Sequence, residues 1–194
     1  MEDKALETLR TILGRRKMET KTERITTDEL ERVNLFTIGS VLVVFSQKDK
    51  GLVERDIKNF LTFAEANGFK NGIVIVALSA PSENVLRVVK SHSKDRVQFF
   101  HIRQLQFDIT THRMWVPHYI WNDEIKSAFP DAAREYERMK IAAPEKELPV
   151  IDSQDPAVRY IGAVPGDTVF IMRHSDVAAQ SPYWRFCVED VNVA

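Results

Sequence analysis

Histidine and cysteine are the residue types through which this chain could bind a metal ion or attack a substrate. The five histidines are His92, His101, His112, His118 and His174, and the lone cysteine is Cys187. His112 and His118 are close in sequence, but Pro117 breaks any helix that could place both imidazoles on one face, and no third ligand is suitably spaced. A lone thiol excludes an internal disulfide and a zinc site built on several thiolates. We therefore expect hydrogen-bonded histidines, a packed thiol, and neither a metal nor another cofactor.

The local signals that would position a functional surface are clearest between residues 148 and 189. Pro149 fixes its own φ and favours an extended Leu148, which predicts a strand. Asp155 followed by Pro156 is typical of a helix start, because the carboxylate accepts free N–H groups and proline suits the first helical position. Gly162 is placed to end that short helix. The segment is therefore expected to form a strand and then a helix.

The remainder of this segment predicts a turn and two strands. Pro165-Gly166 suits the central positions of a type II turn, in which the second central residue has a positive φ. Val169 and Ile171 share one face of the next strand, which is expected to end near Arg173 and be followed by a polar loop. Trp184, Phe186 and Val188 share one face of the last strand. Together these elements predict a small α+β domain.

The order of these signals resembles one known family, the fifth common subunit of eukaryotic RNA polymerases, whose archaeal counterpart corresponds to the C-terminal domain alone. The resemblance rests on Leu148-Pro149-Val150-Ile151, Asp155-Pro156-Ala157-Val158, Tyr160-Ile161-Gly162, Pro165-Gly166-Asp167 and Tyr183-Trp184-Arg185. An unrelated compact α+β domain would explain each piece but not their order.

The first half of the chain alternates strand and helix patterns. Continuous apolar runs at residues 41–45, 73–76 and 97–100 predict strands buried on both faces. A helical spacing joins Val53, Ile57, Phe60, Leu61 and Ala64, and another helix is expected around residues 85–89. A further helix carries Leu6, Leu9, Ile12 and Leu13, and a short one is expected from Asp28 to Val33. Strand–helix–strand alternation predicts an α/β domain with a mainly parallel sheet.

The resemblance extends more weakly into this half and covers roughly residues 36 to 194. Ile73-Val74-Ile75-Val76 leading to Ser79-Ala80-Pro81-Ser82 is similar to the family's sheet strand and following loop. The segments Ile109-Thr110-Thr111-His112 and Val116-Pro117-His118 are similar to its interdomain segment. The resemblance thus implies an N-terminal jaw domain at residues 1–109, with a nuclease-like fold that lacks catalytic residues, and a C-terminal assembly domain at residues 110–194.

The family also implies partners and site residues. The partners are the largest polymerase subunit, other polymerase subunits and downstream duplex DNA, with no membrane and no small-molecule substrate. The assembly surface is expected to contain Pro117, His118, Asp155, Pro156, Arg173 and Arg185, and the DNA-proximal loop Ser79, Pro81 and Ser82. The protein is expected in the nucleus, or in a viral factory or virion if a large DNA virus encodes it. The alternative is a stand-alone DNA-binding or protein-interaction module with the same folds.

A nuclease-like domain requires a test for catalysis. Such nucleases need an acid, one spacer and a lysine on a central strand to bind Mg²⁺ and activate water. The comparable strand here ends Phe45-Ser46-Gln47-Lys48, so Ser46 stands where a carboxylate is required. No phosphate-cradling glycine loop and no Gly-x-Ser-x-Gly elbow occurs either. We expect no catalytic residues and a purely structural subunit.

Charge and hydropathy set further limits. Residues 1–108 contain 18 Lys and Arg against 15 Asp and Glu, a formal charge of +3, and the remainder contains 9 against 13, or −4. Neither half is basic enough for a free-standing DNA-binding module. The densest basic cluster, Arg15-Arg16-Lys17, is expected to be a solvated helix end rather than a DNA contact. The apolar run at residues 73–78 is too short to span a membrane, and charged residues 1–4 do not suggest a signal peptide.

Two departures from the family pattern and one aromatic cluster produce further expectations. The region before Phe36 shows little of the pattern and is expected to be shortened. The stretch between His118 and Leu148 is longer than usual, and Pro130 should restart a helix from Asp131 to Lys140, with Tyr136 and Met139 facing inward. The aromatic residues Trp115, Tyr119 and Trp121 are expected at an interdomain seam or partner contact, with nucleic-acid stacking as the alternative.

Overall fold

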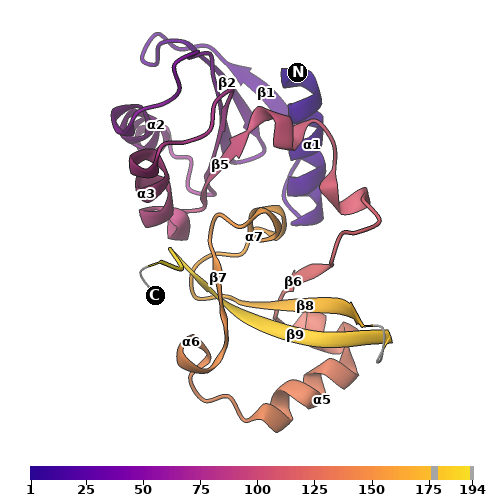
Figure 1. Cartoon of the computed structure of the whole chain (residues 1–194). Coiled ribbons are helices and arrows are strands. Elements are labelled where there is room, and N and C mark those ends of the chain that lie inside the picture. The colour runs from indigo at the N-terminus through magenta and orange to yellow at the C-terminus, as the bar shows by residue number, and fades with distance from the viewer. Residues whose placement is uncertain (176–178, 193–194) are drawn as a thin grey trace. The chain divides into compact units, whose positions relative to one another are not determined.

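The computed structural model describes residues 1–175 and 179–192, and it divides into two compact units, Met1–Asp108 and Ile109–Ala194 (Figure 1). Each unit has its own sheet, so the chain contains mixed α/β structure in two parts. The side chains of residues 174–180 are also outside the described part. This leaves the His174 side chain and the middle of the polar loop expected after Arg173 outside the described residues.

The first unit contains a five-stranded sheet in the order β1-β2-β3-β4-β5. Its strands are β1 (Thr22–Ile25), β2 (Val33–Ile38), β3 (Val41–Ser46), β4 (Ile73–Ala77) and β5 (Val97–His101). Strands β3, β4 and β5 are parallel, whereas β1–β2 and β2–β3 are antiparallel. The expected α/β alternation is present, but the sheet is mixed rather than mainly parallel.

The helix expected from Asp28 to Val33 is not formed: residues 28–32 form bends and a turn, and β2 begins at Val33. The Thr27 hydroxyl accepts the N–H of Glu29 at 3.2 Å, which closes a local turn, and Arg32 has a left-handed φ of 55°. Val33 already belongs to β2, where it and Leu35 pack against the core. Pairing of β2 with β3 therefore overrides the local helical signal.

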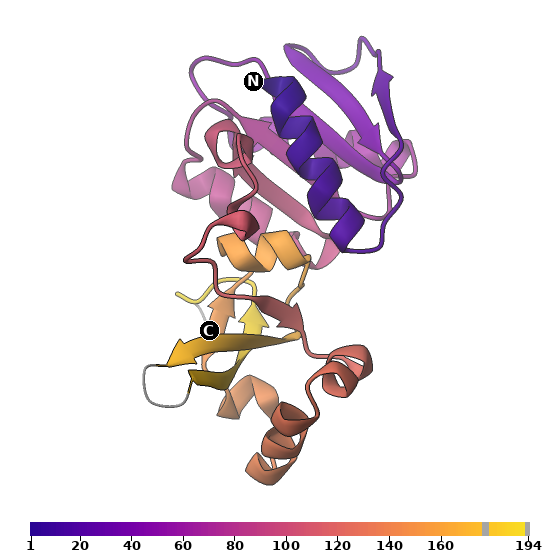
Figure 2. The same ribbon diagram turned by 90° about the vertical axis from the view of Figure 1, so that its right-hand side faces the viewer.

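Helices cover both faces of this sheet (Figure 2). On one face lie α2 (Glu54–Ala66) and α3 (Glu83–Ser91), whose apolar residues join a buried cluster with Leu42, Val44 and Ile75. The opposite face is covered by α1 (Glu2–Arg15), with Leu9 and Ile12 each 1% exposed. Burial on both sides explains why β3 and β4 are continuously apolar, as the sequence predicted.

The second unit is a four-stranded sheet in the order β6-β8-β9-β7. Its strands are β6 (His118–Ile120), β7 (Val150–Asp152), β8 (Thr168–Ser175) and β9 (Ala179–Val188). On one face α7 (Pro156–Ile161) packs, and on the other lie α4 (Asp123–Ala128) and α5 (Pro130–Met139). Of the shorter helices, η1 (Ser93–Asp95) and η2 (Ile102–Leu105) belong to the first unit, whereas η3 (Ile109–Thr111) and α6 (Pro144–Glu147) belong to this one. The expected α+β arrangement of this unit is confirmed, although β8 and β9 extend into the segment predicted as a loop.

The local signals of this unit act as the sequence predicted. An Asp155 carboxylate oxygen accepts the N–H of Ala157 at 2.8 Å and caps α7, and Gly162 ends that helix with a φ of 77°. Gly166 has a φ of 105° in a turn closed by the N–H of Asp167 on the carbonyl of Val164 at 3.0 Å. Only glycine adopts such φ values without strain.

Two residues expected to face a core are exposed instead. Val53 is 58% exposed because it precedes α2, where its N–H bonds the Asp56 carboxylate at 3.0 Å. On α5, Tyr136 packs inward as expected, but Met139 is 48% exposed and Ala132 is the buried residue. Within the described residues, no helix is both long enough and apolar enough to cross a membrane.

Two left-handed glycines of the first unit make a matched pair for a stability test. A Cβ at Gly39 would stand 2.5 Å from the carbonyl oxygen of Glu19, whereas a Cβ at Gly68 would meet no atom within 4 Å. Gly68→Ala should therefore cost about 1–2 kcal/mol for its backbone conformation alone. Gly39→Ala should lower the free energy of unfolding clearly more, because the backbone at Glu19 must also move to make room for the Cβ. Urea unfolding followed by circular dichroism measures both, and equal losses would contradict the close approach.

Candidate functional site

The residues expected to form the assembly surface converge on the α7 side of the second sheet. His118 pairs with Ile171, and Arg185 pairs with Val169. The apolar residues of these two pairs, Ile171 and Val169, are buried against α7. Arg173 follows Ile171 by two positions and therefore shares this face. The set is completed by Pro117, which precedes β6, and by Asp155 and Pro156, at the start of α7. Hydrogen-bonded pairing of β6, β8 and β9 thus collects residues that are far apart in sequence.

Two arginines flank a tyrosine at the rim of this face. The guanidinium carbon of Arg173 lies 4.5 Å from the centre of the Tyr183 ring, and that of Arg185 lies 5.6 Å from it. Tyr183 is half-buried against the apolar cluster, whereas Arg173 is exposed. Arg185 also donates from Nη1 to the carbonyl of Val150 at 3.0 Å. Each cation–π contact at such a site contributes about 0.5–1 kcal/mol, so the ring holds both charged groups in place.

His118 is half-buried beside these arginines. Its Nδ1 bonds the carbonyl of Val116 at 2.6 Å, and its ring centre lies 5.8 Å from that of Trp115. Burial lowers the pKa of His118, and the positive charges of Arg173 and Arg185 act in the same direction. The Val116 carbonyl and Asp155 oppose this shift. The imidazole is therefore held in its neutral form on a face that already carries two cations.

One charged residue of this region was not singled out by the sequence. Arg159 on α7 is only 5% exposed, and burial lowers its pKa to about 10 although Asp155 opposes the shift. A buried arginine is unusual and reflects a specific structural role. The sequence feature that could have indicated Arg159 is its position four residues after Asp155, on the helix that Asp155 caps. In the structure, the Arg159 N–H bonds the Asp155 carbonyl at 2.9 Å.

The second expected site, the loop at residues 79–82, divides into an inward and an outward part. The Ser79 hydroxyl is buried and makes no hydrogen bond within the described residues, and a Cβ at Gly51 would stand 2.9 Å from it. Ser82 is exposed, and its hydroxyl caps α3 by accepting the N–H of Val85 at 3.4 Å. Pro81 is half-buried between them. Ser82 is thus the member of this loop best placed for a surface contact.

Comparison with known proteins links the second unit to transcription. The family model described as RNA polymerase Rpb5, C-terminal domain, matches residues 107–187. DNA-directed RNA polymerase subunit Rpo5 of Thermococcus onnurineus is 41% identical over 85 residues, which cover 44% of this chain and 94% of that protein. The Rpo5 of Pyrococcus horikoshii is 38% identical over the same shares. The chain belongs to this polymerase subunit family.

A plant relative extends the similarity beyond the second unit. Subunit 5B of DNA-directed RNA polymerases IV and V of Arabidopsis thaliana is 28% identical over 117 residues, covering 60% of this chain and 49% of that protein. An alignment of this length exceeds the second unit and so reaches into the first. The family model covers the whole range from Pro117 to Arg185, whereas Ser79, Pro81 and Ser82 lie outside it.

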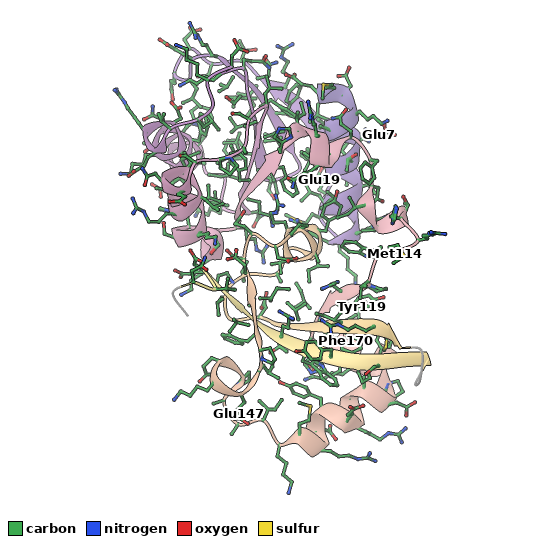
Figure 3. All side chains as sticks on the ribbon, viewed as in Figure 1. Glu7, Glu19, Met114, Tyr119, Glu147 and Phe170 are labelled. Atoms are coloured by element: carbon green, nitrogen blue, oxygen red, sulfur yellow. The ribbon has the colours of Figure 1, made fainter. Side chains whose placement is uncertain are left out.

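Tyr119 and Trp121 belong to the aromatic core of the second unit, which corrects the expected seam for these two residues. Tyr119 and Trp121 point to the α5 side, where Tyr119 stacks on Phe170 with ring centres 6.1 Å apart (Figure 3). Trp115 lies on the other face, 6.0 Å from the ring of Tyr160. Alternation along β6 keeps Tyr119 on the face opposite His118 and Ile120, whereas Trp115 lies before the strand begins.

The remaining candidate ligands have local structural partners. The ring Nδ1 atoms of His92, His101 and His112 bond backbone groups of Val88, Arg103 and Met114 at 3.0–3.2 Å. In the part of the chain that the structure describes, no group of three His, Cys, Asp or Glu residues could hold a metal ion. Cys187 is fully buried, and burial raises its thiol pKa to about 12, which confirms a packed, unreactive thiol.

The basic cluster at the end of α1 has two exposed members, Arg15 and Lys17, and one partly buried member, Arg16. Arg15 makes two bonds to the Asp108 carboxylate at 3.0 and 2.5 Å. Arg16 donates to the buried Gln98 side chain at 3.0 Å, and burial lowers its pKa to about 10, with Arg96 adding to the shift. The expectation of a solvated helix end is therefore wrong for Arg16, whereas Arg15 is exposed as expected although it pairs with Asp108.

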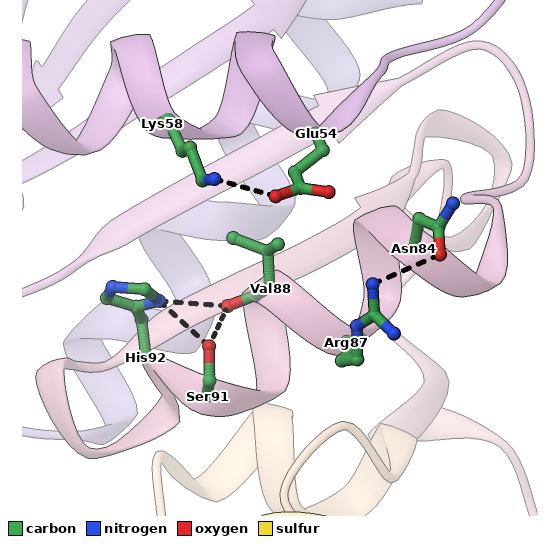
Figure 4. Close-up of polar contacts among 7 residues, drawn as sticks. All are labelled: Glu54, Lys58, Asn84, Arg87, Val88, Ser91 and His92. Atoms are coloured by element: carbon green, nitrogen blue, oxygen red, sulfur yellow. Dashed lines mark hydrogen bonds and ion pairs between the residues drawn. The ribbon is translucent and has the colours of Figure 1, made fainter.

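The outer surface of α2 and α3 carries charges of both signs (Figure 4). Glu54 and Lys58 form an ion pair at 2.7 Å, and Arg87 donates to the Asn84 side chain at 3.3 Å. The hydrogen bond from Lys58 lowers the pKa of Glu54, and the charge of Arg87 contributes. Mixed charges give this surface little net attraction for a phosphate backbone.

His118 makes the stability of the second unit depend on pH. Its pKa is lower in the folded state, so the stabilisation is fully present above the ordinary histidine pKa of about 6.5 and is lost as the pH falls below it. His118→Asn retains a donor at the Nδ1 position and does not titrate. The urea midpoint should therefore fall less in this variant on acidification. All three tryptophans lie in this unit, so their fluorescence measures it; equal acid sensitivity would contradict the assignment.

Proposed function

We propose that this protein is a non-catalytic subunit of a DNA-directed RNA polymerase. The observation that carries the proposal is the coincidence of two findings on the second unit. The family match spans residues 107–187, and the α7 face of the same segment gathers His118, Arg173 and Arg185 into one surface. Surface residues of differing chemistry that are held in one place by strand pairing are suited to contact a partner.

The second unit is proposed to anchor the chain to the largest polymerase subunit. The archaeal relatives support this role, because the matched segment accounts for 94% of the Rpo5 of Thermococcus onnurineus. A polymerase subunit that consists almost entirely of this unit must make its assembly contacts through it. The assembly role is therefore assigned to residues 110–194, and to the α7 face within them.

The first unit is proposed to be the jaw domain that faces downstream DNA, with a nuclease-like fold. Its separate core supports an independent role, and the formal charge of +3 over residues 1–108 is compatible with a position near DNA. The exposed Ser82 at the start of α3 offers the contact, since helix N-termini attract anions. Outside the polymerase, a formal charge of +3 and one helix N-terminus provide few phosphate contacts, so the free subunit should bind DNA weakly.

Catalysis is proposed to be absent from the first unit. The hydroxyl of the buried Ser46 accepts the N–H of Lys48 at 3.2 Å, and the Lys48 ammonium pairs with Asp56 at 2.6 Å. Asp56 is also the acceptor for the N–H of Val53 at the start of α2. Lys48 and Asp56 therefore serve the helix start, and Ser46 offers no carboxylate for Mg²⁺.

The location follows from the polymerase. Plant relatives are subunits of polymerases IV and V, which supports a nuclear location, with a viral factory or virion as the alternative for a virus-encoded member. The competing function is a stand-alone DNA-binding or interaction module. A formal charge of −1 for the whole chain argues against free DNA binding.

Co-purification tests the proposed function. The full chain and a fragment of residues 110–194, each carrying an affinity tag, should both recover the largest polymerase subunit in stoichiometric amount from native cells. A tagged fragment of residues 1–109 provides the matched control and should recover much less, because it lacks the α7 face. Recovery of the polymerase by neither the full chain nor the C-terminal fragment would reject the polymerase role and favour a stand-alone module.

Photo-crosslinking tests the jaw assignment. A photoreactive residue at Ser82 should label downstream duplex DNA in the assembled elongation complex. The same residue at Glu7, exposed on α1 across the sheet, provides the control and should label DNA less. Labelling of protein alone from Ser82, with DNA engaged elsewhere in the complex, would leave Ser82 a simple helix cap. Nanomolar DNA binding by the free chain at physiological salt would favour the stand-alone alternative.

A further inference from the structure

Arg173, Tyr183 and Arg185 place two positive charges beside one aromatic ring, and this set is here called the arginine–tyrosine cluster. All three side chains project from the α7 face of the β8–β9 hairpin, because Ile171 pairs with Tyr183 and Val169 with Arg185. The tyrosine ring packs on the buried cluster and lies 4.5 and 5.6 Å from the two guanidinium carbons. The ring therefore favours positions of both charges beside it before any ligand binds, and preorganisation of this kind lowers the entropic cost of binding.

Neither arginine is neutralised within the described residues. Arg173 makes no hydrogen bond or ion pair there, and Arg185 donates only to the Val150 carbonyl. In the same part of the chain, Arg15 and Lys48 do pair with carboxylates, at 2.5 and 2.6 Å. The cluster thus differs from these structural cations: most of its guanidinium donors remain available.

Two acids at the start of α7 already accept backbone N–H groups. A carboxylate oxygen of Asp155 accepts the N–H of Ala157 at 2.8 Å, and one of Asp152 accepts the N–H of Gln154 at 2.8 Å. These acids hold the start of α7 and the turn before it. Among the described residues no acid pairs with either guanidinium, so the cluster can accept a carboxylate from another molecule.

A planar guanidinium bonds both carboxylate and phosphate oxygens in pairs, so net charge must decide between protein and nucleic acid. Residues 109–194 carry a formal charge of −4, with 9 Lys and Arg against 13 Asp and Glu. A negative unit repels a phosphate backbone over its whole surface, whereas a single carboxylate on a folded protein needs only the local cations. The charge balance favours a protein carboxylate.

We propose that the arginine–tyrosine cluster binds the carboxylate of an Asp or Glu side chain on another polymerase subunit. This inference rests on the proposed function and adds the chemistry of the contact. The carboxylate would take the open edges of the Arg173 and Arg185 guanidinium groups, while the Tyr183 ring holds them apart. The neutral His118 beside them avoids adding a third positive charge that would need compensation.

Charge reversal in the assembled polymerase tests the contact. Arg173→Glu in the full chain should reduce the amount of this subunit retained on the polymerase after a salt wash by about tenfold, because it places like charges together. Arg138→Glu is the matched control: Arg138 is exposed on α5, on the opposite face of the sheet, and its reversal should leave retention unchanged. Retention of Arg173→Glu at the wild-type level would overturn the proposal.

Folding must be separated from binding. Arg173 is exposed and its replacement removes only a weak cation–π contact, so tryptophan fluorescence should show Arg173→Glu still folded at the temperature of the retention assay. If that variant is partly unfolded there, Arg173→Lys replaces it. Lysine keeps the charge but loses the paired donors, and it should still weaken retention with an unchanged melting temperature. Full retention of a folded Arg173→Lys variant would then count against the proposal.

A photo-crosslinker identifies the partner group. Ser181 pairs with Arg173 across the hairpin, so a photoreactive residue at this position lies beside the cluster without replacing any member. Mass spectrometry should find the crosslink on a polymerase segment containing Asp or Glu, and reversing that acid to Arg should restore retention of Arg173→Glu. A crosslink to DNA or to a segment without acids would overturn the proposal. A wild-type chain that never recovers the polymerase would instead reject the proposed function itself.

Discussion

The antiparallel pairing of β8 with β9 is the constraint on which the second unit depends. Its register sets Val169 against Arg185, Phe170 against Trp184 and Ile171 against Tyr183. Because side chains alternate along a strand, this register places one set on the α7 side and the other on the α5 side. A slip of one residue would exchange the two sets and bury the arginines in an aromatic core. Both cores and the assembly face follow from one register.

The two faces created by this pairing have different chemistry. On the α5 side, Phe170 and Trp184 pack with Tyr119, Trp121 and other rings into an aromatic core. The α7 side has a smaller aliphatic cluster, whose rim bears charged and polar groups. Aromatic packing provides a large buried area to hold the hairpin in place. Stability is thus concentrated on one face, which leaves the rim of the other to carry charges that neighbouring residues do not neutralise.

The first unit shows the contrasting use of charge. Arg15 bonds Asp108, Arg16 bonds Gln98, and Lys48 bonds Asp56. Each pair fixes a helix or loop at the border of a sheet that is covered on both faces. Other cations of this unit, such as Arg24 and Arg55, are exposed to solvent. The two units therefore differ in how they hold particular cations: carboxylates hold Arg15 and Lys48 in the first, and a tyrosine ring lies beside Arg173 and Arg185 in the second.

The sequence by itself determined the local structure wherever a residue type permits few conformations. Asp155-Pro156, Gly162 and Pro165-Gly166 fixed a helix start, a helix end and a turn, and continuous apolar runs fixed the strands buried on both sides. The order of those signals was also sufficient to indicate the family. Such features depend on neighbouring residues alone, because φ limits and capping act within a few positions.

Only the tertiary structure decided which residues meet. Residues 28–33 carried a helical signal, yet β2 formed because Val33 and Leu35 gain burial beside β3. Tyr119 and Trp121 were expected at a seam, but their position on β6 places them in a core, and the face of β6 is set by its pairing with β8. The meeting of Arg173 and Arg185 around Tyr183 likewise depends on strand register. Register is a long-range property, fixed by burial summed over whole strands, and no local pattern contains it.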